Sequence, residues 1–428
     1  MGQAIGLATT PIVSRIYDTS AYGEYALFTS IATVFAVVSQ AGLASAIMMP
    51  KEDAEARMVF NSAFIFMVAF VSIAFLTLIV ISPFFRIFSF GTSYAYILTA
   101  LAFHMLLTNA SNLLRVYVNR LKMYRVLFWN SIISASVTLA ITIPLGILGA
   151  GVWGFIMAGI IGNAICVAQM LMKANPFSRL GLAQFKQVLS NYRRFIFLQF
   201  PANMMDTLSQ QLPNQILGSA FGSASLGSYS MSNKILGIPS RLIAAPVNTV
   251  YFRTAVEYVQ KGKDLASFTF KMVKKILYCA SVPIIVLIAF GEPLFSFVLG
   301  SQWEEAGLLS AMLSFQYALT FCQTCVSYCR VALDRQGVNM AMSICNLAIV
   351  GTSLLVGIVL FVNPIQVVAC FALGSCLVQM IDMLINFICL KHYAFSYVIF
   401  IVTYLCIVGF IGLGIRFAVQ SAIGFASW

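Results

Sequence analysis

The chain has 428 residues, of which 61% are hydrophobic and 9% are charged, and its mean hydropathy is +0.93. This composition excludes a string of soluble domains, although the length alone would allow about two or three of them. The formal net charge of +12 would suggest a nucleic-acid partner for a soluble protein. In a membrane protein basic residues have a topological role instead, so we expect no nucleic-acid partner.

Apolar segments follow one another along the whole chain. They cover residues 2–16, 23–47, 58–82, 93–119, 124–147, 150–173, 194–220, 223–250, 271–297, 304–329, 338–362, 365–390 and 396–416. These runs are too long and too evenly apolar for barrel strands. We therefore expect an all-α polytopic membrane protein with about 12 or 13 transmembrane helices. The first segment is short and lacks a preceding basic region, so it does not resemble a cleavable signal peptide.

The basic residues predict the orientation in the membrane. If the N-terminus starts in the cytoplasm, twenty Lys and Arg residues fall in cytoplasmic loops and helix ends, whereas only Arg15 and Arg86 fall on the other side. Cytoplasmic loops carry an excess of Lys and Arg. The sequence therefore predicts a multi-pass protein with a cytoplasmic N-terminus.

The sequence contains an internal repeat. Five polar positions of the fourth segment recur in the tenth at a constant offset: Thr108, Asn112, Arg115, Asn119 and Arg120 match Gln323, Ser327, Arg330, Asp334 and Arg335. Each repeat holds six helices, which predicts two parallel lobes related by a pseudo-twofold axis along the membrane normal. We expect an N-lobe at 1–173, a cytoplasmic interfacial linker at 174–193, a C-lobe at 194–391 and an extra transmembrane segment at 392–428.

Polar side chains share one face of several segments. Helical spacing places His104, Asn112 and Arg115 on one face of the fourth segment, and Gln323 and Arg330 on one face of the tenth. Lipid does not solvate such a face, so we expect it to meet other polar groups or water.

The seventh and eighth segments carry charged groups near the middle of the membrane. The polar residues that share a face are Asn203, Asp206, Gln210 and Asn214 in the seventh segment, and Lys234 and Arg241 in the eighth. Two prolines interrupt the hydrogen-bond ladder of each segment. Each charge costs on the order of 3 kcal/mol at this depth. Either Asp206 and Lys234 form a structural ion pair, or a water-filled cavity between the lobes solvates all of these groups.

The charge balance of such a cavity is positive. Its basic candidates are Arg15, Arg115, Lys234, Arg241 and Arg330, and its acidic ones are Glu24, Asp206 and Asp382. A cationic vestibule favours an anionic substrate, and arginine suits phosphate because its guanidinium donates two parallel hydrogen bonds. Amide and hydroxyl groups suit sugar hydroxyls. The residues therefore favour a lipid-linked, phosphorylated glycan.

The stretch from Pro11 to Ala56 resembles the N-terminal signature of Wzx-type O-antigen and polysaccharide flippases, which belong to the multidrug/oligosaccharidyl-lipid/polysaccharide exporter superfamily. The residues that carry the resemblance are Pro11, Ser14, Arg15, Ile16, Tyr17, Gly23, Glu24, Tyr25, Gly42, Ala46 and Pro50. Over the remaining chain the likeness is topological. The resemblance implies a V-shaped carrier in the bacterial inner membrane that flips undecaprenyl-pyrophosphate-linked oligosaccharide to the periplasmic leaflet by alternating access.

The resemblance also implies partners and alternatives. A flippase of O-antigen or other surface polysaccharide would work with membrane lipids, a polysaccharide polymerase and the chain-length machinery. Transport by such a flippase can be coupled to a gradient of protons or sodium ions, and no other cofactor is expected. A cation-coupled drug exporter of the same fold is one alternative, although it would need more cavity acids. A membrane polymerase or ligase acting on lipid-linked sugars is less well supported, because the outer loops are short.

Overall fold

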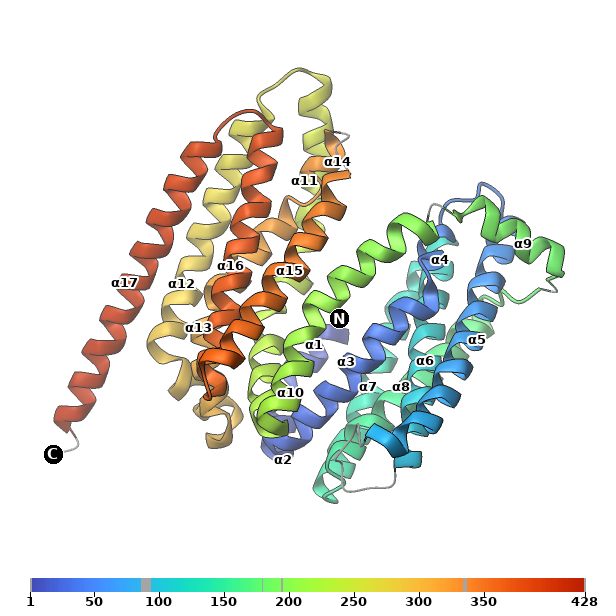
Figure 1. The fold of residues 1–428 in the computed structure, drawn as a ribbon, viewed down its shortest axis with the longest axis horizontal. Coiled ribbons are helices and arrows are strands. Elements are labelled where there is room, and N and C mark those ends of the chain that lie inside the picture. The colour runs from blue at the N-terminus through green and yellow to red at the C-terminus, as the bar shows by residue number, and fades with distance from the viewer. Residues whose placement is uncertain (1, 86–93, 179, 194, 334–336, 427–428) are drawn as a thin grey trace. The chain divides into compact units, whose positions relative to one another are not determined.

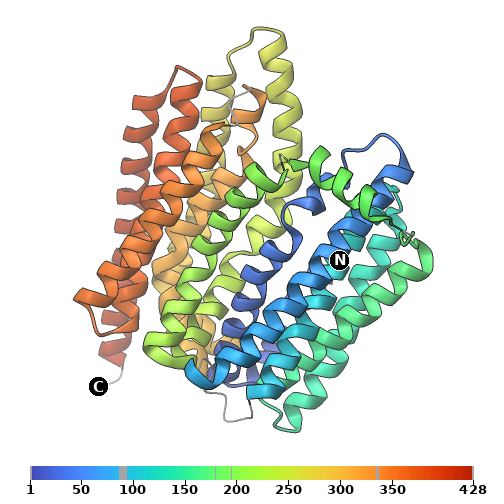
Figure 2. The same ribbon diagram turned by 45° about the vertical axis from the view of Figure 1, so that its right-hand side comes forward.

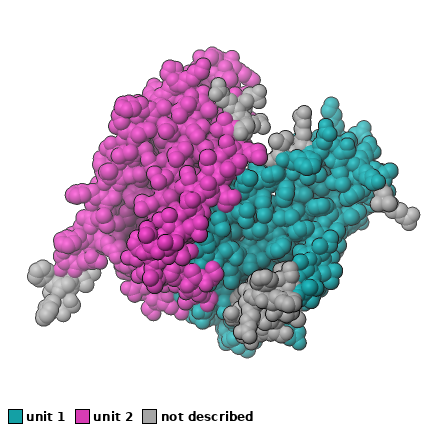
Figure 3. Space-filling model, in the orientation of Figure 1, with its two compact units in different colours: residues 1–218 teal, residues 219–428 magenta. Residues whose placement is uncertain are grey.

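The computed structural model describes residues 2–85, 94–178, 180–193, 195–333 and 337–426. Every regular element in these ranges is a helix (Figures 1 and 2). The chain forms two compact units, which Figure 3 colours separately. Unit 1 is Met1–Gly218 and unit 2 is Ser219–Trp428.

Unit 1 begins with two short helices, because the first predicted segment is interrupted at Thr9 and Pro11 lies in the first turn of the second helix. Its elements are α1 (Gly2–Ala8), α2 (Thr10–Ile16), α3 (Thr19–Gln40), α4 (Leu43–Ala46), α5 (Asp53–Phe85), α6 (Tyr94–Arg120), α7 (Tyr124–Ile147), α8 (Val152–Lys173), α9 (Leu182–Asn191), η1 (Phe195–Gln199) and the first part of α10 (Phe200–Leu236). Helix α6 packs against both α5 and α8, and the buried core of the unit includes Phe28, Phe60 and Tyr117.

Unit 2 contains the second part of α10 and the remaining helices. These are η2 (Ser240–Ala244), α11 (Ala245–Gln260), α12 (Leu265–Leu299), η3 (Ser301–Trp303), α13 (Glu304–Cys325), α14 (Cys329–Ala332), α15 (Gly337–Leu360), α16 (Pro364–Cys389) and α17 (Ala394–Ala426). Helix α13 packs against α12 and α16, and α17 packs against α12. The core of this unit includes Leu277, Leu319 and Phe387.

A turn at Gly222 divides α10. Gly222 has φ 83° and ψ 178°, a conformation that only glycine adopts readily. The sequence predicted a break between the seventh and eighth segments at this place, and the structure confirms it.

Nine helices within the described ranges are long and apolar enough to cross a membrane. Large apolar side chains cover the outward faces of these helices; on α17, Phe410 and Phe417 are 81% and 75% exposed. Exposure of this kind suits a lipid solvent rather than water. The predicted class of all-α polytopic membrane protein is confirmed. The pseudo-twofold symmetry, the V-shaped cavity and the domain boundaries stay predictions.

Helices α12 and α13 approach each other closely where two glycines meet. A Cβ atom added to Gly307 would lie 2.3 Å from the carbonyl oxygen of Gly291, and one added to Gly291 would lie 2.6 Å from that of Gly307. Small residues allow membrane helices to gain packing contacts that replace the hydrophobic effect. This contact therefore depends on both positions remaining glycine.

Gly307→Ala is expected to destabilise the protein by about 1–3 kcal/mol, because the backbone of α12 must move away from the new methyl group. Thermal unfolding in detergent measures the effect. Gly351→Ala is the matched control, since Gly351 also lies in a membrane helix but has nothing within 4 Å of its Cβ position. Equal midpoints for the two variants would contradict the prediction.

The segment after α8 is fastened to α5 by side-chain hydrogen bonds. Asn61 is 5% exposed, and its Nδ2 donates to the carbonyl oxygen of Pro176 and to Ser178 Oγ, each at 3.1 Å. Further along, Tyr192 donates to Glu55 Oε1 at 2.9 Å. Burial and this hydrogen bond raise the pKa of Tyr192 to about 12, so its hydroxyl remains a donor at physiological pH.

Asn61→Leu is expected to release this segment from α5, because the two backbone and hydroxyl acceptors lose their donor. The local free energy of unfolding of the segment should fall by about 1–3 kcal/mol, which should increase the rate of tryptic cleavage between residues 173 and 193. Asn119→Leu serves as the control, because Asn119 is an exposed amide near the end of α6. Unchanged cleavage in Asn61→Leu would contradict the role of these hydrogen bonds.

Candidate functional site

The polar face predicted for the fourth segment lies on α6, and its members differ in exposure. Asn112 is exposed and Arg115 is half-buried, and the guanidinium Nε of Arg115 has no hydrogen-bond partner among the described residues. Thr108 Oγ1 accepts a hydrogen bond from Asn163 Nδ2 of α8 at 3.1 Å. Asn163 was not among the predicted site residues, although an amide within an apolar segment was a visible signal.

His104 lies deeper in unit 1 than the sequence suggested. It is 7% exposed, and its ring packs edge-on against Phe28 with 5.3 Å between the centroids. Gly159 makes room for the imidazole, since a Cβ atom there would lie 3.1 Å from its Cε1. We expected His104 on an open polar wall; the structure instead places it in the packed interior, because an aromatic ring and a glycine provide a fitting space.

The first part of α10 carries the predicted polar sector of the seventh segment. Asn203, Asp206 and Asn214 are half-buried and Gln210 is exposed. Asn214 Nδ2 donates to Gln211 Oε1 at 3.0 Å within the same helix. Ser209 and Pro213, three and seven residues after Asp206 on the same side of the helix, are buried, so the sector is accessible only in part.

The opposite side of α10 is tied to α3. Gln215 lies nine residues after Asp206, which places it on the far side of the helix, and its Nε2 donates to Ser30 Oγ of α3 at 2.6 Å. This hydrogen bond anchors the first part of α10 within unit 1.

In unit 2, two cations follow each other on the second part of α10 and on η2. Lys234 is half-buried and Arg241 is exposed, and Arg241 Nη2 donates to the carbonyl oxygen of Lys234. The side chain of Arg241 lies along the helix over Gly237, whose missing Cβ would be 3.3 Å from that nitrogen. Pro239 cannot donate to the helical ladder, and the π-helix η2 follows it. The bent backbone thus positions an exposed guanidinium beside a lysine.

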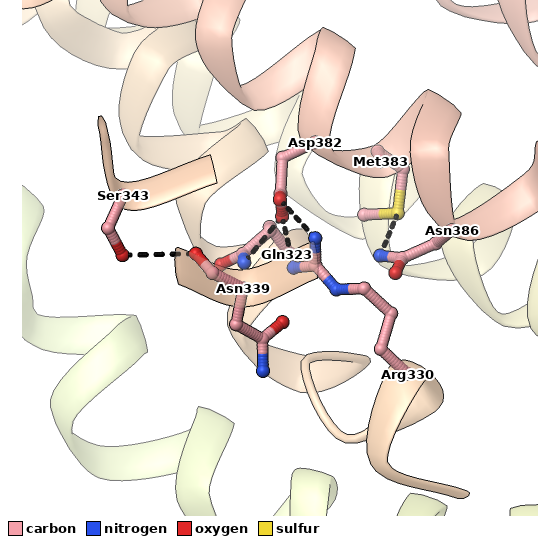
Figure 4. A network of polar contacts seen from close by, with 7 residues as sticks. All are labelled: Gln323, Arg330, Asn339, Ser343, Asp382, Met383 and Asn386. Atoms are coloured by element: carbon pink, nitrogen blue, oxygen red, sulfur yellow. Dashed lines mark hydrogen bonds and ion pairs between the residues drawn. The ribbon is translucent and has the colours of Figure 1, made fainter. Parts of the chain in front are cut away.

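Arg330 is also more buried than the sequence suggested. In Figure 4 its guanidinium points toward Asp382 of α16. Nη1 lies 2.8 Å from Oδ1, Nη2 donates to Oδ2 at 3.1 Å, and the two side chains are only 4% and 7% exposed. Gln323 Nε2 donates to the same Oδ2 at 2.7 Å. We expected Arg330 and Gln323 on a cavity wall; in this structure both are engaged inside unit 2, because Asp382 supplies the counter-charge.

The two predicted charges near the N-terminus lie at different depths. Arg15 is exposed on α2, and Glu24 is half-buried on α3. Between them Tyr17 is fixed, because its hydroxyl donates to the carbonyl oxygen of Thr142 at 2.7 Å and its ring lies 4.2 Å from that of Phe155. The signature region is therefore a packed junction of α2, α3, α7 and α8.

The exposed or half-buried polar residues define two candidate surfaces, one on each unit. The unit 1 surface consists of Asn112, Arg115, Asn203, Asp206, Gln210 and Asn214, and the unit 2 surface consists of Lys234 and Arg241. The unit 1 surface offers hydrogen-bond donors and acceptors, and the two cations of the unit 2 surface offer donors only. Such groups can bind an anion and polar hydroxyls without any catalytic chemistry.

Comparisons with known proteins agree with this fold. A family model described as "Polysaccharide biosynthesis protein" matches residues 12–307. The succinoglycan biosynthesis transport protein ExoT of Rhizobium meliloti (strain 1021) is 24% identical over 323 residues, which is 75% of this chain and 64% of that protein. The aligned part thus spans less than two thirds of the relative's length.

Solved structures share the fold. The lipid II flippase MurJ in an inward closed conformation has a TM-score of 0.62 and 14% identity, with 99% of this chain and 96% of that chain covered. An inward-facing multidrug resistance MATE family transporter of the MOP superfamily has a TM-score of 0.62 and 12% identity, with 91% and 95% covered. These named proteins are transporters and a flippase, which agrees with the prediction of a protein that is not an enzyme. Because the family model matches well over half of the sequence, the chain belongs to the polysaccharide biosynthesis protein family of membrane proteins.

Proposed function

We propose that this protein carries lipid-linked polysaccharide precursors across the bacterial inner membrane. Membership of the polysaccharide biosynthesis family supports the kind of cargo, and the similarity to a transport protein and to a lipid flippase supports the kind of process. The proposed cargo is an undecaprenyl-pyrophosphate-linked oligosaccharide, which moves from the cytoplasmic to the periplasmic leaflet by alternating access. The positive-inside distribution of Lys and Arg supports a cytoplasmic N-terminus.

The observation that carries this proposal is the exposed guanidinium of Arg241 beside Lys234 on a proline-bent membrane helix. No ion pair recorded within the described part of unit 2 includes Arg241, whereas Arg330 and Arg416 each have an acidic partner. An unneutralised cation in a membrane segment is costly unless water or an anionic ligand solvates it. A pyrophosphate group is a ligand of that kind, because its oxygens accept the paired hydrogen bonds that a guanidinium donates.

A flipping assay tests the proposal. The purified protein is reconstituted into liposomes that contain a fluorescent undecaprenyl-pyrophosphate-linked oligosaccharide, and an external quencher reports which leaflet holds the probe. We expect the fraction accessible to the quencher to rise faster than in protein-free vesicles. A fluorescent phosphatidylethanolamine is the control, and it should not move faster.

Two outcomes would overturn the proposal. In the first, the lipid-linked glycan moves no faster than in protein-free liposomes, with or without a proton or sodium gradient. In the second, a cationic dye is transported while the glycan is not, which would favour a drug exporter of the same fold. Polymerase and chain-length proteins are proposed partners, and cross-linking in cells that make the polysaccharide would test them.

A further inference from the structure

One end of unit 2 gathers lysines and aromatic rings where α16 ends and α12 and α17 begin. These helices pack side by side in the structure, and α17 contacts both of the others (Figures 1 and 2). The four lysines are Lys271, Lys274, Lys275 and Lys391, and the aromatic residues are Phe270, Tyr278, Tyr393 and Phe400. We call this group the lysine–aromatic seam. The sequence predicts that it lies at the cytoplasmic boundary of the membrane.

The turn between α16 and α17 is held in an unusual conformation. Lys391 and Tyr393 both have positive φ, 61° and 64°, which costs energy in residues other than glycine. The ring of Tyr393 stacks on Phe270 of α12, with 5.3 Å between the centroids and 22° between the planes. This contact brings the turn, and with it Lys391, to the side of α12 that carries the other lysines. Lys391 lies just beyond the end of α16, where a left-handed conformation commonly ends a helix, so its positive φ sets the path of the turn.

On α12 the lysines share one stripe. Lys271, Lys274 and Lys275 are three and four residues apart, so they lie on the same face of the helix, and Tyr278 continues that face. The ammonium of Lys274 lies 4.4 Å from the ring centroid of Phe270 and 5.2 Å from that of Phe400 on α17. Cation–π contacts with two rings restrict where this ammonium points. It is therefore positioned in the seam rather than extended freely into water.

The seam carries positive charge without a recorded counter-ion. The ion pairs within the described part of unit 2 are Lys261–Glu257, Arg330–Asp382 and Arg416–Glu292, and none includes a seam lysine. Lys271, Lys275 and Lys391 are exposed. Four lysines at a membrane boundary provide the charge that a phosphate head group requires. The aromatic rings beside them lie where the glycerol and the upper acyl chains of such a lipid would be.

We propose that the lysine–aromatic seam binds the phosphate head group of an anionic phospholipid from the surrounding leaflet. The lysines contact the phosphate as point charges, and the rings of Tyr278, Tyr393 and Phe400 pack beside the glycerol and the upper acyl chains. The topological role of lysine explains why basic residues lie on this side, but it does not require the aromatic rings that hold Lys274. The seam shares no residue with the two candidate surfaces, so the lipid site can be tested independently of the proposed function.

Native mass spectrometry of the full-length protein tests the site with phosphatidylglycerol as the probe. Phosphatidylglycerol is expected to bind with at least about tenfold higher affinity than zwitterionic phosphatidylethanolamine. The triple variant Lys271→Gln/Lys274→Gln/Lys391→Gln should lose this preference. The matched control is Lys51→Gln/Lys173→Gln/Lys186→Gln, which removes three exposed lysines of unit 1 on the predicted cytoplasmic side. This control variant should keep the preference for phosphatidylglycerol.

Single variants keep the test decisive if the triple variant does not fold. Lys274→Arg should retain the preference for phosphatidylglycerol, because arginine also makes cation–π contacts and binds phosphate. Lys274→Gln should weaken binding about threefold or more, and so should Phe400→Leu, which removes one of the two rings that hold the ammonium.

Three results would overturn the proposal. The first is an equal loss of phosphatidylglycerol binding in the seam and control triple variants, which would indicate general surface charge. The second is equal binding of the two lipids by the parent protein. The third is displacement of the lipid by millimolar inorganic phosphate or pyrophosphate, which would indicate a site for a free anion.

Discussion

Asp382→Asn is expected to destabilise the folded protein by about 3–5 kcal/mol, because it leaves the guanidinium of Arg330 buried without a counter-charge. The pair is nearly sealed from solvent, with 4% and 7% of the side chains exposed. The amide can still accept a hydrogen bond from Gln323, so the loss should come mainly from the charge. Thermal or denaturant unfolding in detergent measures it, and much of the protein should be lost from the membrane fraction.

The double variant Arg330→Met/Asp382→Leu separates charge from packing. Removing both charges avoids the buried, unpaired guanidinium, so stability should return to within about 1–2 kcal/mol of the parent. Recovery on that scale would mean that the pair sets the local arrangement of α14 and α16 more than it stabilises the fold. If transport were lost in a stable double variant, the pair would have a role in function as well.

Glu292→Gln is the matched control for the single substitution. It breaks the pair with Arg416, whose Nη2 lies 2.8 Å from Glu292 Oε2, but there the side chains are 24% and 29% exposed. Solvent can stabilise the remaining arginine, so we expect a loss of about 1 kcal/mol or less. Asp382→Asn with an effect no larger than that of Glu292→Gln would refute the argument from burial.

The sequence predicted much of the fold because membrane helices leave strong local signals. Long apolar runs identified the spans, and the break at Gly222 followed from a turn expected near Phe221 to Ser223, between two apolar segments. The division of the first segment at Thr9 was not predicted, although Pro11, two residues later, was a visible sign of a new helix start.

The candidate site was less predictable because helical spacing assigns a residue to a face but does not identify what that face meets. Arg330 has the same spacing signal as Arg115, yet it pairs with Asp382, which is 52 residues away on another helix. His104 shares a face with Asn112 but packs against Phe28 and beside Gly159. Such partners depend on tertiary packing, and only Asp382, an acid within an apolar segment, gave a signal in the sequence.

The remaining predictions concern transport, and substitutions at Arg241 should have the largest effect. Arg241→Lys is expected to retain part of the activity, because a point charge still attracts phosphate but loses the bidentate hydrogen bonds. Arg241→Gln should transport less, and Arg241→Glu should nearly abolish transport by repelling an anionic head group. The liposome assay with the fluorescent lipid-linked glycan measures all three at equal protein density.

The matched control for this series is Arg253, an exposed arginine on α11 of the same unit. Arg253→Gln and Arg253→Glu change the net charge by the same amounts, so they report any general effect of charge on insertion or transport. They should leave the rate within about twofold of the parent, because Arg253 lies roughly 18 Å of helix from Arg241, which is more than the Debye length of about 10 Å. Unfolding midpoints must also be compared, since substitutions in a membrane segment can reduce stability.

The order of the Arg241 variants decides between two roles for this residue. Its guanidinium donates to the carbonyl oxygen of Lys234, and Lys or Gln at this position can replace that hydrogen bond to different degrees without reference to charge. If Arg241 served only to hydrogen-bond this carbonyl, the Arg241→Gln and Arg241→Glu variants would differ mainly in stability, and their transport selectivity would be the same. If the guanidinium binds an anion, Glu should lose transport of the pyrophosphate-linked glycan at normal expression and stability. A fully active Arg241→Glu variant would contradict anion binding, and the positive charge would then serve the bend of α10 and η2 alone.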